Sequence, residues 1–362
     1  MPESSIVVRP EPMDSGDYTA SSRLQAAGLK PAIAVFERAA AEVPLPKPPQ
    51  PIVIADYGAA SGHNCLLPIG AAIGVLRNRT RPEHSVLVVH TDRPDNDFTA
   101  LFRTLEEDPD SYLSKDAATY ASAIGRSFYG QILPSNSVHL GWSSYAIQWL
   151  SQVLALSLGG RLQAAHCEDE AVRSAYAKQA AQDWQDFVAF RGRELCPGGR
   201  LLVMTMGIGD DGEVGFRPLL SAMIDTLREL ASAGLITADE VGRMCIPTVA
   251  RRAADFVAPF APSGRFERLE IEHLDIFDAD DRFWNRYRAT GDAAEFGARW
   301  AGFARASTFR ALTAGLDGGV DDPRTADLFD RLEKGIAQRL AAAPEQTQIP
   351  LAHVVLVKRP RG

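Results

Sequence analysis

The sequence predicts an α/β fold, a doubly wound and mainly parallel β-sheet with a helical cap over one end. Short apolar strands alternate with helical patterns in the first 212 residues, which is typical of a parallel sheet covered by helices on both faces. Beyond residue 212 helical patterns dominate, and residues 351–359, "LAHVVLVKR", close the chain with another strand pattern. The 362 residues are enough for two units or one enlarged domain.

The elements are predicted in chain order from their apolar periodicity. The strands lie within 45–58 and at 85–92, 137–144, 197–207, 265–277 and 351–359; the helices lie at 65–79, 143–152, 170–195, 216–235 and 294–316. The sheet is therefore expected to resume after helical insertions, and these insertions form the cap.

Composition and charge exclude several classes of protein. The net charge is −8 and the pI is about 5.5, whereas a nucleic-acid surface needs clustered lysine and arginine. No stretch approaches the ~20 apolar residues that span a bilayer, and the first residues lack the pattern of a signal peptide. The four cysteines have neither zinc-site nor disulfide-framework spacing. We expect a cytoplasmic protein that binds no metal and has no membrane span; a homodimer is compatible with this composition.

A glycine-bearing loop and a strand-end acid indicate an adenosine-type cofactor. The loop "DYGAASGHN" (56–64) joins the first strand to the first helix, and Gly58 and Gly62 permit a tight turn. Asp92 ends the second strand, where a carboxylate can accept both hydroxyls of a ribose. Taken alone, the loop also fits an ordinary turn, and Asp92 also fits a helix N-cap. The two features do not choose between NAD and S-adenosylmethionine (SAM).

A polar and aromatic face distinguishes the helix predicted at 143–152, "SSYAIQWLSQ". Tyr145, Gln148, Trp149 and Gln152 share it at spacings i, i+3, i+4 and i+7. Such a face on one helix is more often ordinary packing than a site. Tyr18, Ser22 and Gln25 repeat a similar spacing near the N-terminus, and the two faces together favour a binding site.

Six segments in order resemble the SABATH family of SAM-dependent carboxyl methyltransferases. They are "DYTASSRLQ" (17–25), "DYGAASGHN" (56–64), "TDRPDNDFT" (91–99), "RSFYGQILP" (126–134), "SSYAIQWLSQV" (143–153) and "PGGRLLV" (197–203). More narrowly, the chain resembles actinobacterial fatty-acid O-methyltransferases. The resemblance implies a Rossmann-like class I methyltransferase fold with an antiparallel last strand. It also implies SAM as cofactor and a small carboxylic acid as partner.

The resemblance also implies the site residues. Gln25 and Trp149 would hold the substrate carboxylate as the catalytic pair. The implied cofactor residues are Tyr18, Ser22, Asp56, Gly58, Asn64, Asp92, Arg93, Ser127, Phe128 and Ser143; the further substrate residues are Tyr145, Gln148, Leu220, Met223 and Val249. Arg93 and His63 depart from the family's leucine and proline, and the asparagine-rich segment that could hold a metal is absent.

The predicted organisation has four parts. They are an N-terminal lid at 1–30, a SAM-binding core at 31–212, a helical cap at 213–320 with a core strand near 265–277, and a return to the core at 321–362.

The chemistry expected from these residues is methyl transfer to a carboxylate. A carboxylate with a pKa of roughly 4 to 5 is ionised at neutral pH and needs no general base. Leu220, Met223 and Val249 predict a pocket for a medium-chain fatty acid. The alternatives are a small aromatic acid such as benzoate or salicylate, a non-catalytic SAM sensor, and a NAD-dependent oxidoreductase.

Overall fold

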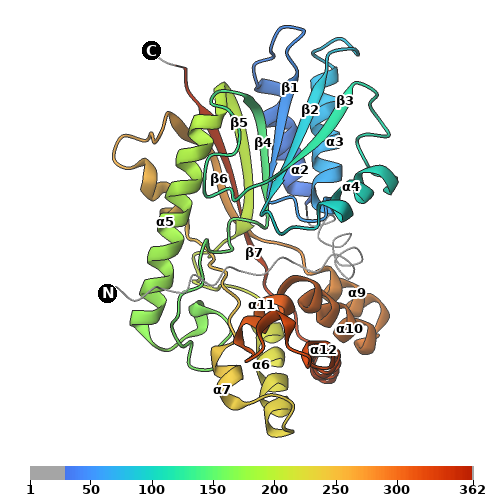
Figure 1. Cartoon of the computed structure of the whole chain (residues 1–362), viewed down its shortest axis with the longest axis vertical. Coiled ribbons are helices and arrows are strands. Elements are labelled where there is room, and N and C mark those ends of the chain that lie inside the picture. The colour runs from blue at the N-terminus through green and yellow to red at the C-terminus, as the bar shows by residue number, and fades with distance from the viewer. Residues whose placement is uncertain (1–28, 361–362) are drawn as a thin grey trace.

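The structure, a computed structural model, describes residues 29–360 and has a sheet layer above a layer of helices (Figure 1). The sheet has seven strands in the order β3-β2-β1-β4-β5-β7-β6. The first five strands in chain order run parallel, and β7 runs antiparallel to both of its neighbours. The strands are β1 Ile52–Tyr57, β2 Val86–Asp92, β3 Thr119–Gly125, β4 Val138–Ser144, β5 Leu195–Met206, β6 Leu269–Asp278 and β7 Pro350–Lys358. The predicted doubly wound sheet with an antiparallel last strand is confirmed.

Helices cover both faces of the sheet. On one face α2 (Lys30–Glu42), α3 (His63–Arg77) and α4 (Phe98–Glu107) enclose a core with the strands. On the other face α5 (Glu170–Glu194) packs Trp184 and Phe187 against the sheet. No helix of the described residues is both long enough and apolar enough to cross a bilayer.

Aspartates fix where four of the helices begin. The side chains of Asp97, Asp169, Asp281 and Asp292 each accept a hydrogen bond from a backbone N–H of the first turn of α4, α5, α9 (Arg282–Thr290) or α10 (Ala293–Ala304). This satisfies donors that a helix N-terminus leaves free. Because Asp97 caps α4, Asp92 is not needed as the cap.

The helix predicted at 143–152 is wrong. Ser143 and Ser144 still pair with β5, so β4 continues to residue 144. Tyr145 then takes a left-handed conformation with φ +52°, which right-handed helices do not contain. Trp149 next forms an isolated antiparallel bridge with Thr248. The segment is therefore a strand end followed by a turn.

Strand β3 was not predicted from the sequence. Its small, partly exposed residues form no clear apolar pattern.

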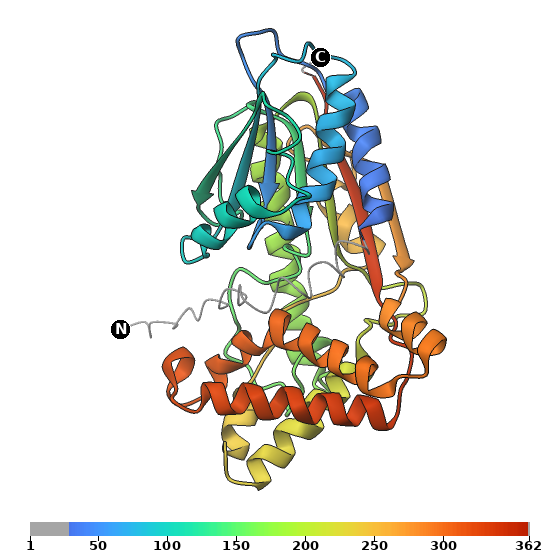
Figure 2. The ribbon, with the colours of Figure 1, turned by 90° about the vertical axis from the view of Figure 1, so that its right-hand side faces the viewer.

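The second layer is a helical cap below the sheet (Figure 2). Its core joins α6, α10 and the later α12 with shorter helices between them. The further bounds are α6 Arg217–Ser232, α7 Ala238–Arg243, α8 Ala253–Val257, α11 Arg310–Leu312 and α12 Thr325–Ala342, with a π-helix at Arg305–Phe309. Because α12 packs in this core, the chain returns to the sheet only at β7, later than the boundary placed at residue 321.

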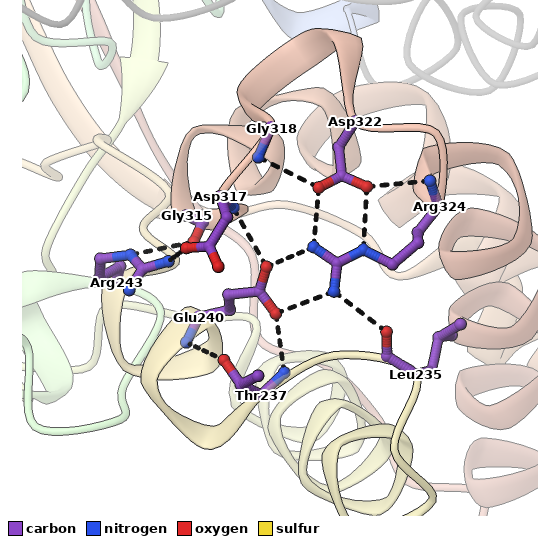
Figure 3. A network of polar contacts seen from close by, with 9 residues as sticks. All are labelled: Leu235, Thr237, Glu240, Arg243, Gly315, Asp317, Gly318, Asp322 and Arg324. Atoms are coloured by element: carbon purple, nitrogen blue, oxygen red, sulfur yellow. Dashed lines mark hydrogen bonds and ion pairs between the residues drawn. The ribbon is translucent and has the colours of Figure 1, made fainter.

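A buried ion-pair network fastens two parts of the cap together (Figure 3). Glu240 on α7 is fully buried and binds Arg324, which precedes α12. Arg324 also binds Asp322 through its Nη2 at 2.7 Å. The Glu240 carboxylate accepts further hydrogen bonds from the backbone N–H groups of Thr237, at 2.7 Å, and Asp317, at 3.1 Å. These contacts lower the pKa of Glu240 to about 2, with the Arg324 hydrogen bonds as the main cause.

Candidate active site

The loop between β1 and α3 depends on its glycines. Gly58 and Gly62 have φ of +89° and +88°, which residues with a Cβ rarely adopt. A Cβ at Gly58 would lie 2.3 Å from that of Ala146. The loop therefore lies directly against the turn after β4, and only glycine allows this approach.

Asp92 fastens the same loop to the end of β2. Its Oδ2 accepts a hydrogen bond from the N–H of Ala60 at 2.7 Å, and its Oδ1 accepts one from that of Arg93 at 2.7 Å. Burial raises the pKa of Asp92 to about 6, against the lowering by these two bonds. Each oxygen has a second lone pair for a ligand hydroxyl, so the geometry suits the predicted ribose contact.

Arg93 points elsewhere. Its guanidinium forms an ion pair with Asp95 at 2.6 Å on the surface. Only its backbone N–H contacts the Asp92 carboxylate. The side chain thus gives little support to the predicted cofactor role.

Asp56, an implied cofactor residue, is buried and hydrogen-bonded within the protein. Its carboxylate is 2% exposed and lies 2.8 Å from Nδ1 of His90. Because a carboxylate only accepts, Nδ1 donates to Asp56, and Nε2 lies 2.6 Å from the hydroxyl of Tyr112. The thiol of Cys65 donates to the carbonyl of Gly62 at 3.0 Å. Among the described residues Asp56, Cys65 and His90 are the one group of clustered metal-type donors; each already has a hydrogen-bond partner, so we assign them a supporting role.

The segment that follows β3 forms the next wall of the cofactor side. Phe128 approaches Gly58, with 3.5 Å between its ring and the place of a Cβ there. Arg191 on α5 donates to the carbonyls of Phe128 and Gly130, at 2.9 and 2.8 Å, and pairs with the fully buried Glu194. Ser127, which the resemblance implied as a cofactor residue, adjoins Phe128 in this segment.

Three contacts hold the turn after β4. The hydroxyl of Ser143 donates to the carbonyl of Tyr57 at 2.8 Å. Arg251 is 2% exposed and donates to the carbonyl of Ile147 at 2.8 Å. The hydroxyl of Tyr129 donates to the carbonyl of Trp149 at 2.6 Å. The turn is thus tied to β1, to the segment after β3 and to the cap side.

An apolar cavity lies between this turn and the cap. Of the predicted substrate residues, Tyr145, Gln148, Trp149, Leu220 and Met223 line it. Val249 does not, because its side chain packs in a separate cluster around Leu150 and Tyr176. The Val249 backbone N–H instead donates to the carbonyl of Gln148.

The sequence analysis missed most of the cap side of the cavity. Four aromatic side chains line it there, Phe216, Phe283, Trp300 and Phe303. The ring centroids of Phe283 and Phe303 lie 4.9 and 5.5 Å from that of Trp300, edge to face. Trp300 and Phe303 share one face of α10 at spacing i, i+3, which was the available signal.

Other predicted residues stand apart from this geometry. Asn64 is buried in the first turn of α3, beside the glycine loop. Tyr18, Ser22 and Gln25 lie outside the described residues.

Comparison with known proteins then identifies the chain. Residues 11–359 match the family model described as SAM dependent carboxyl methyltransferase. The chain belongs to this family.

Similar proteins include methyltransferases of plants. Salicylate carboxymethyltransferase of Clarkia breweri is 28% identical over 252 residues, which is 67% of each chain. Gibberellic acid methyltransferase 1 of Arabidopsis thaliana is 29% identical over 331 residues, covering 85% of this chain and 84% of its own. A solved structure of loganic acid methyltransferase with SAH shares the fold, with a TM-score of 0.76 at 22% identity over 98% and 99% of the two chains.

A SAM-dependent carboxyl methyltransferase needs a cofactor cradle and an acceptor pocket that meet, and the glycine loop and the cavity are the candidates for the two in this chain. The glycine loop contacts Ala146, and Tyr145, the residue directly before Ala146, lines the cavity. SAM supplies an electrophilic methyl group on a sulfonium. What the protein has to provide for such a transfer is orientation of the acid and exclusion of water from the reacting atoms.

Proposed function

We propose that this methyltransferase acts on the carboxylate of a small, mainly apolar free acid held in the cavity between turn and cap. The observation that carries the proposal is the cavity's polarity. Its walls are mostly apolar, and Trp149 and Gln148 bring N–H donors to it from the turn beside the glycine loop. The Oε1 of Gln148 accepts from the hydroxyl of Thr205 at 3.3 Å, which leaves its Nε2 for a ligand.

Neutral donors suit this reaction. The carboxylate is negative and the sulfonium positive before transfer, and both charges fade at the transition state. An arginine or lysine on the carboxylate would stabilise the ground state most, which does not raise the rate. Trp149 offers one indole N–H, and Gln25, outside the described residues, is its proposed partner. No general base is required because the nucleophile is already ionised.

The class of acid is the finer part of the proposal. The sequence favours a medium-chain fatty acid, and Leu220 and Met223 in the cavity support that choice. The cap rings around Trp300 support a ring-bearing acid instead, since aromatic pairs gain about 0.5–1.5 kcal/mol beyond area burial. An alkyl chain gains area burial alone, about 0.8 kcal/mol for each buried CH₂, so the contacts with the cap rings are the contribution that a ring-bearing acid adds to its own burial. We place ring-bearing acids first and medium-chain fatty acids second.

A competition assay tests the proposal. Octanoate, benzoate and salicylate are supplied together at equal concentration with SAM, and the methyl esters are separated by mass spectrometry. The proposal expects esters, with a ring acid ahead. If octanoate gives the most ester, the fatty-acid prediction is restored. Tight SAM binding with no ester from any of the acids would instead favour a SAM sensor.

A further inference from the structure

Besides Gln148 and Asp281, two further buried polar side chains line the cavity. Gln163 and Thr248 are 9% and 6% exposed. Both line the cavity, and Nε2 of Gln163 lies 2.9 Å from Oγ1 of Thr248. Ligand pockets with apolar walls usually carry a few such groups, which fix the ligand's orientation.

This pair is not satisfied by its own hydrogen bond. Among the described residues nothing binds the other end of the Gln163 amide. The Thr248 hydroxyl accepts from Gln163, and its own proton remains available to a ligand. The free oxygen of the amide keeps some exposed surface, so it can accept a hydrogen bond from a ligand that enters the cavity.

Other hydroxyls of the lining differ in this respect. Ser307 and Thr308, on the π-helix, donate to the carbonyls of Phe303 and Ala304 at 2.6 and 2.8 Å. Their protons are therefore used within their own helix. Gln163 and Thr248 therefore offer an acceptor and a donor in addition to the N–H groups of Gln148 and Trp149.

The position of the pair sets where the ligand group must be. Thr248 stands opposite Trp149 in an isolated antiparallel bridge. Residues directly opposite each other in such a pairing have Cβ atoms about 4.5–5.5 Å apart and share a face. The pair thus lies close to the proposed carboxylate donor.

We infer that the acceptor acid carries a hydroxyl or carbonyl oxygen within a few bonds of its carboxylate, and that Gln163 and Thr248 recognise this oxygen. The inference rests on the proposed function and narrows it. A site built to bind a substrate hydroxyl discriminates strongly against the analogue without it, because its own polar groups are then left unpaired. Gln163 and Thr248 are specificity residues in this account and take no part in the methyl transfer.

The test uses acids that differ only in the hydroxyl, on two unrelated skeletons. They are octanoate against 2- and 3-hydroxyoctanoate, and benzoate against salicylate. The wild-type enzyme should favour at least one hydroxylated member by about tenfold or more in kcat/KM. Calorimetry of each acid on the enzyme loaded with SAH should give the same order without turnover.

Two variants and one matched control assign the preference to the pair. Gln163→Met keeps the side-chain length and Thr248→Val the shape, and each should bring the preference to within about twofold. Thr248→Ser keeps the hydroxyl and should keep the preference. Unchanged SAH affinity and thermal midpoint check the fold.

Several results would overturn the inference. Esters from all the acids with no hydroxyl preference would refute it while leaving the proposed function intact. Equal losses for both members of each pair would make Gln163–Thr248 a tether between two loops. No ester from any acid, with SAM still bound, would overturn the proposed function and this inference together.

Discussion

At the scale of single residues, the proposed site needs two side chains whose polar groups can still bind a ligand. Asp92 uses one lone pair of each oxygen on the backbone of the glycine loop and the next residue. Trp149 is fixed by its backbone, through Tyr129 and the bridge to Thr248, so its indole can serve the ligand. Contacts with backbone groups thus hold both residues in place, and each keeps a polar group that can bind a ligand.

Replacing Asp92 with alanine should weaken SAM binding. The variant loses hydrogen bonds from ribose hydroxyls to a charged group, worth roughly 1.5–3 kcal/mol each. Isothermal calorimetry measures the loss. Asp95→Ala is the matched control, because Asp95 is exposed and its ion pair among the described residues is the one with Arg93. Equal affinity in the two variants would remove Asp92 from the site.

Replacing Trp149 with phenylalanine should slow methylation while the protein stays folded. The ring remains in the cavity and the N–H donor is lost. We expect a loss on the order of 1 kcal/mol in transition-state stabilisation, read from kcat/KM. A variant with wild-type kcat/KM would show that the indole does not hold the carboxylate.

At the scale of elements, the segment after β3 connects the cofactor side with the acceptor side. Helix α5 clamps it through Arg191 and Glu194, and this pair is fully buried. Phe128 then lies by the glycine loop while its neighbour Tyr129 holds the carbonyl of Trp149. One short segment therefore positions groups on both sides of the site.

Tyr129→Phe should affect the acid and spare the cofactor. Loss of the 2.6 Å hydrogen bond to Trp149 leaves that carbonyl without its partner, at a cost of about 1–3 kcal/mol if it stays buried. We expect KM for the acid to rise several-fold, with SAM affinity unchanged. Tyr120→Phe on the exposed face of β3 is the control, and a loss of SAM affinity in Tyr129→Phe would contradict a positioning role.

Elements with a pattern in neighbouring residues could be predicted from the sequence. Contacts between residues far apart in the chain could not. Asp56 and Asp92 could be placed at strand ends because the strands are apolar runs with an acid at the end. Trp149 was chosen for a helix face, yet its segment is a turn because Ser143 and Ser144 pair with β5, some 60 residues later. No local pattern could bring Gln163 against Thr248, which lies 85 positions away.

At the scale of the whole molecule, the protein is two layers with the acceptor cavity between them. The sheet layer supplies the glycine loop and the turn after β4, and the cap supplies the rings of α9 and α10. The cap has its own core and its own polar fastening at Glu240 and Arg324. Its integrity should therefore decide which acids bind.

The cap network predicts an acid-dependent stability. Because the folded pKa of Glu240 is about 2 and its ordinary value is 4.5, its contribution is complete above pH 4.5 and is lost as the pH falls toward 2. Glu240→Gln should cost about 1–3 kcal/mol at pH 7 through lost charged hydrogen bonds. Urea unfolding at pH 7, 5, 4 and 3 should show the gap to wild type narrowing below pH 4.5; a gap independent of pH would contradict this role.

The most direct measurement follows the oxygens of the acceptor. An acid that the enzyme methylates is labelled with ¹⁸O at both carboxyl oxygens and incubated with SAM and the enzyme. The mass of the methyl ester is then measured by mass spectrometry. Attack by a carboxylate oxygen on the methyl group breaks no bond of the acid, so the account predicts a methyl ester that keeps both labels. An ester with only one label would mean that a carbon–oxygen bond of the acid was broken, and this result would contradict methyl transfer to the carboxylate.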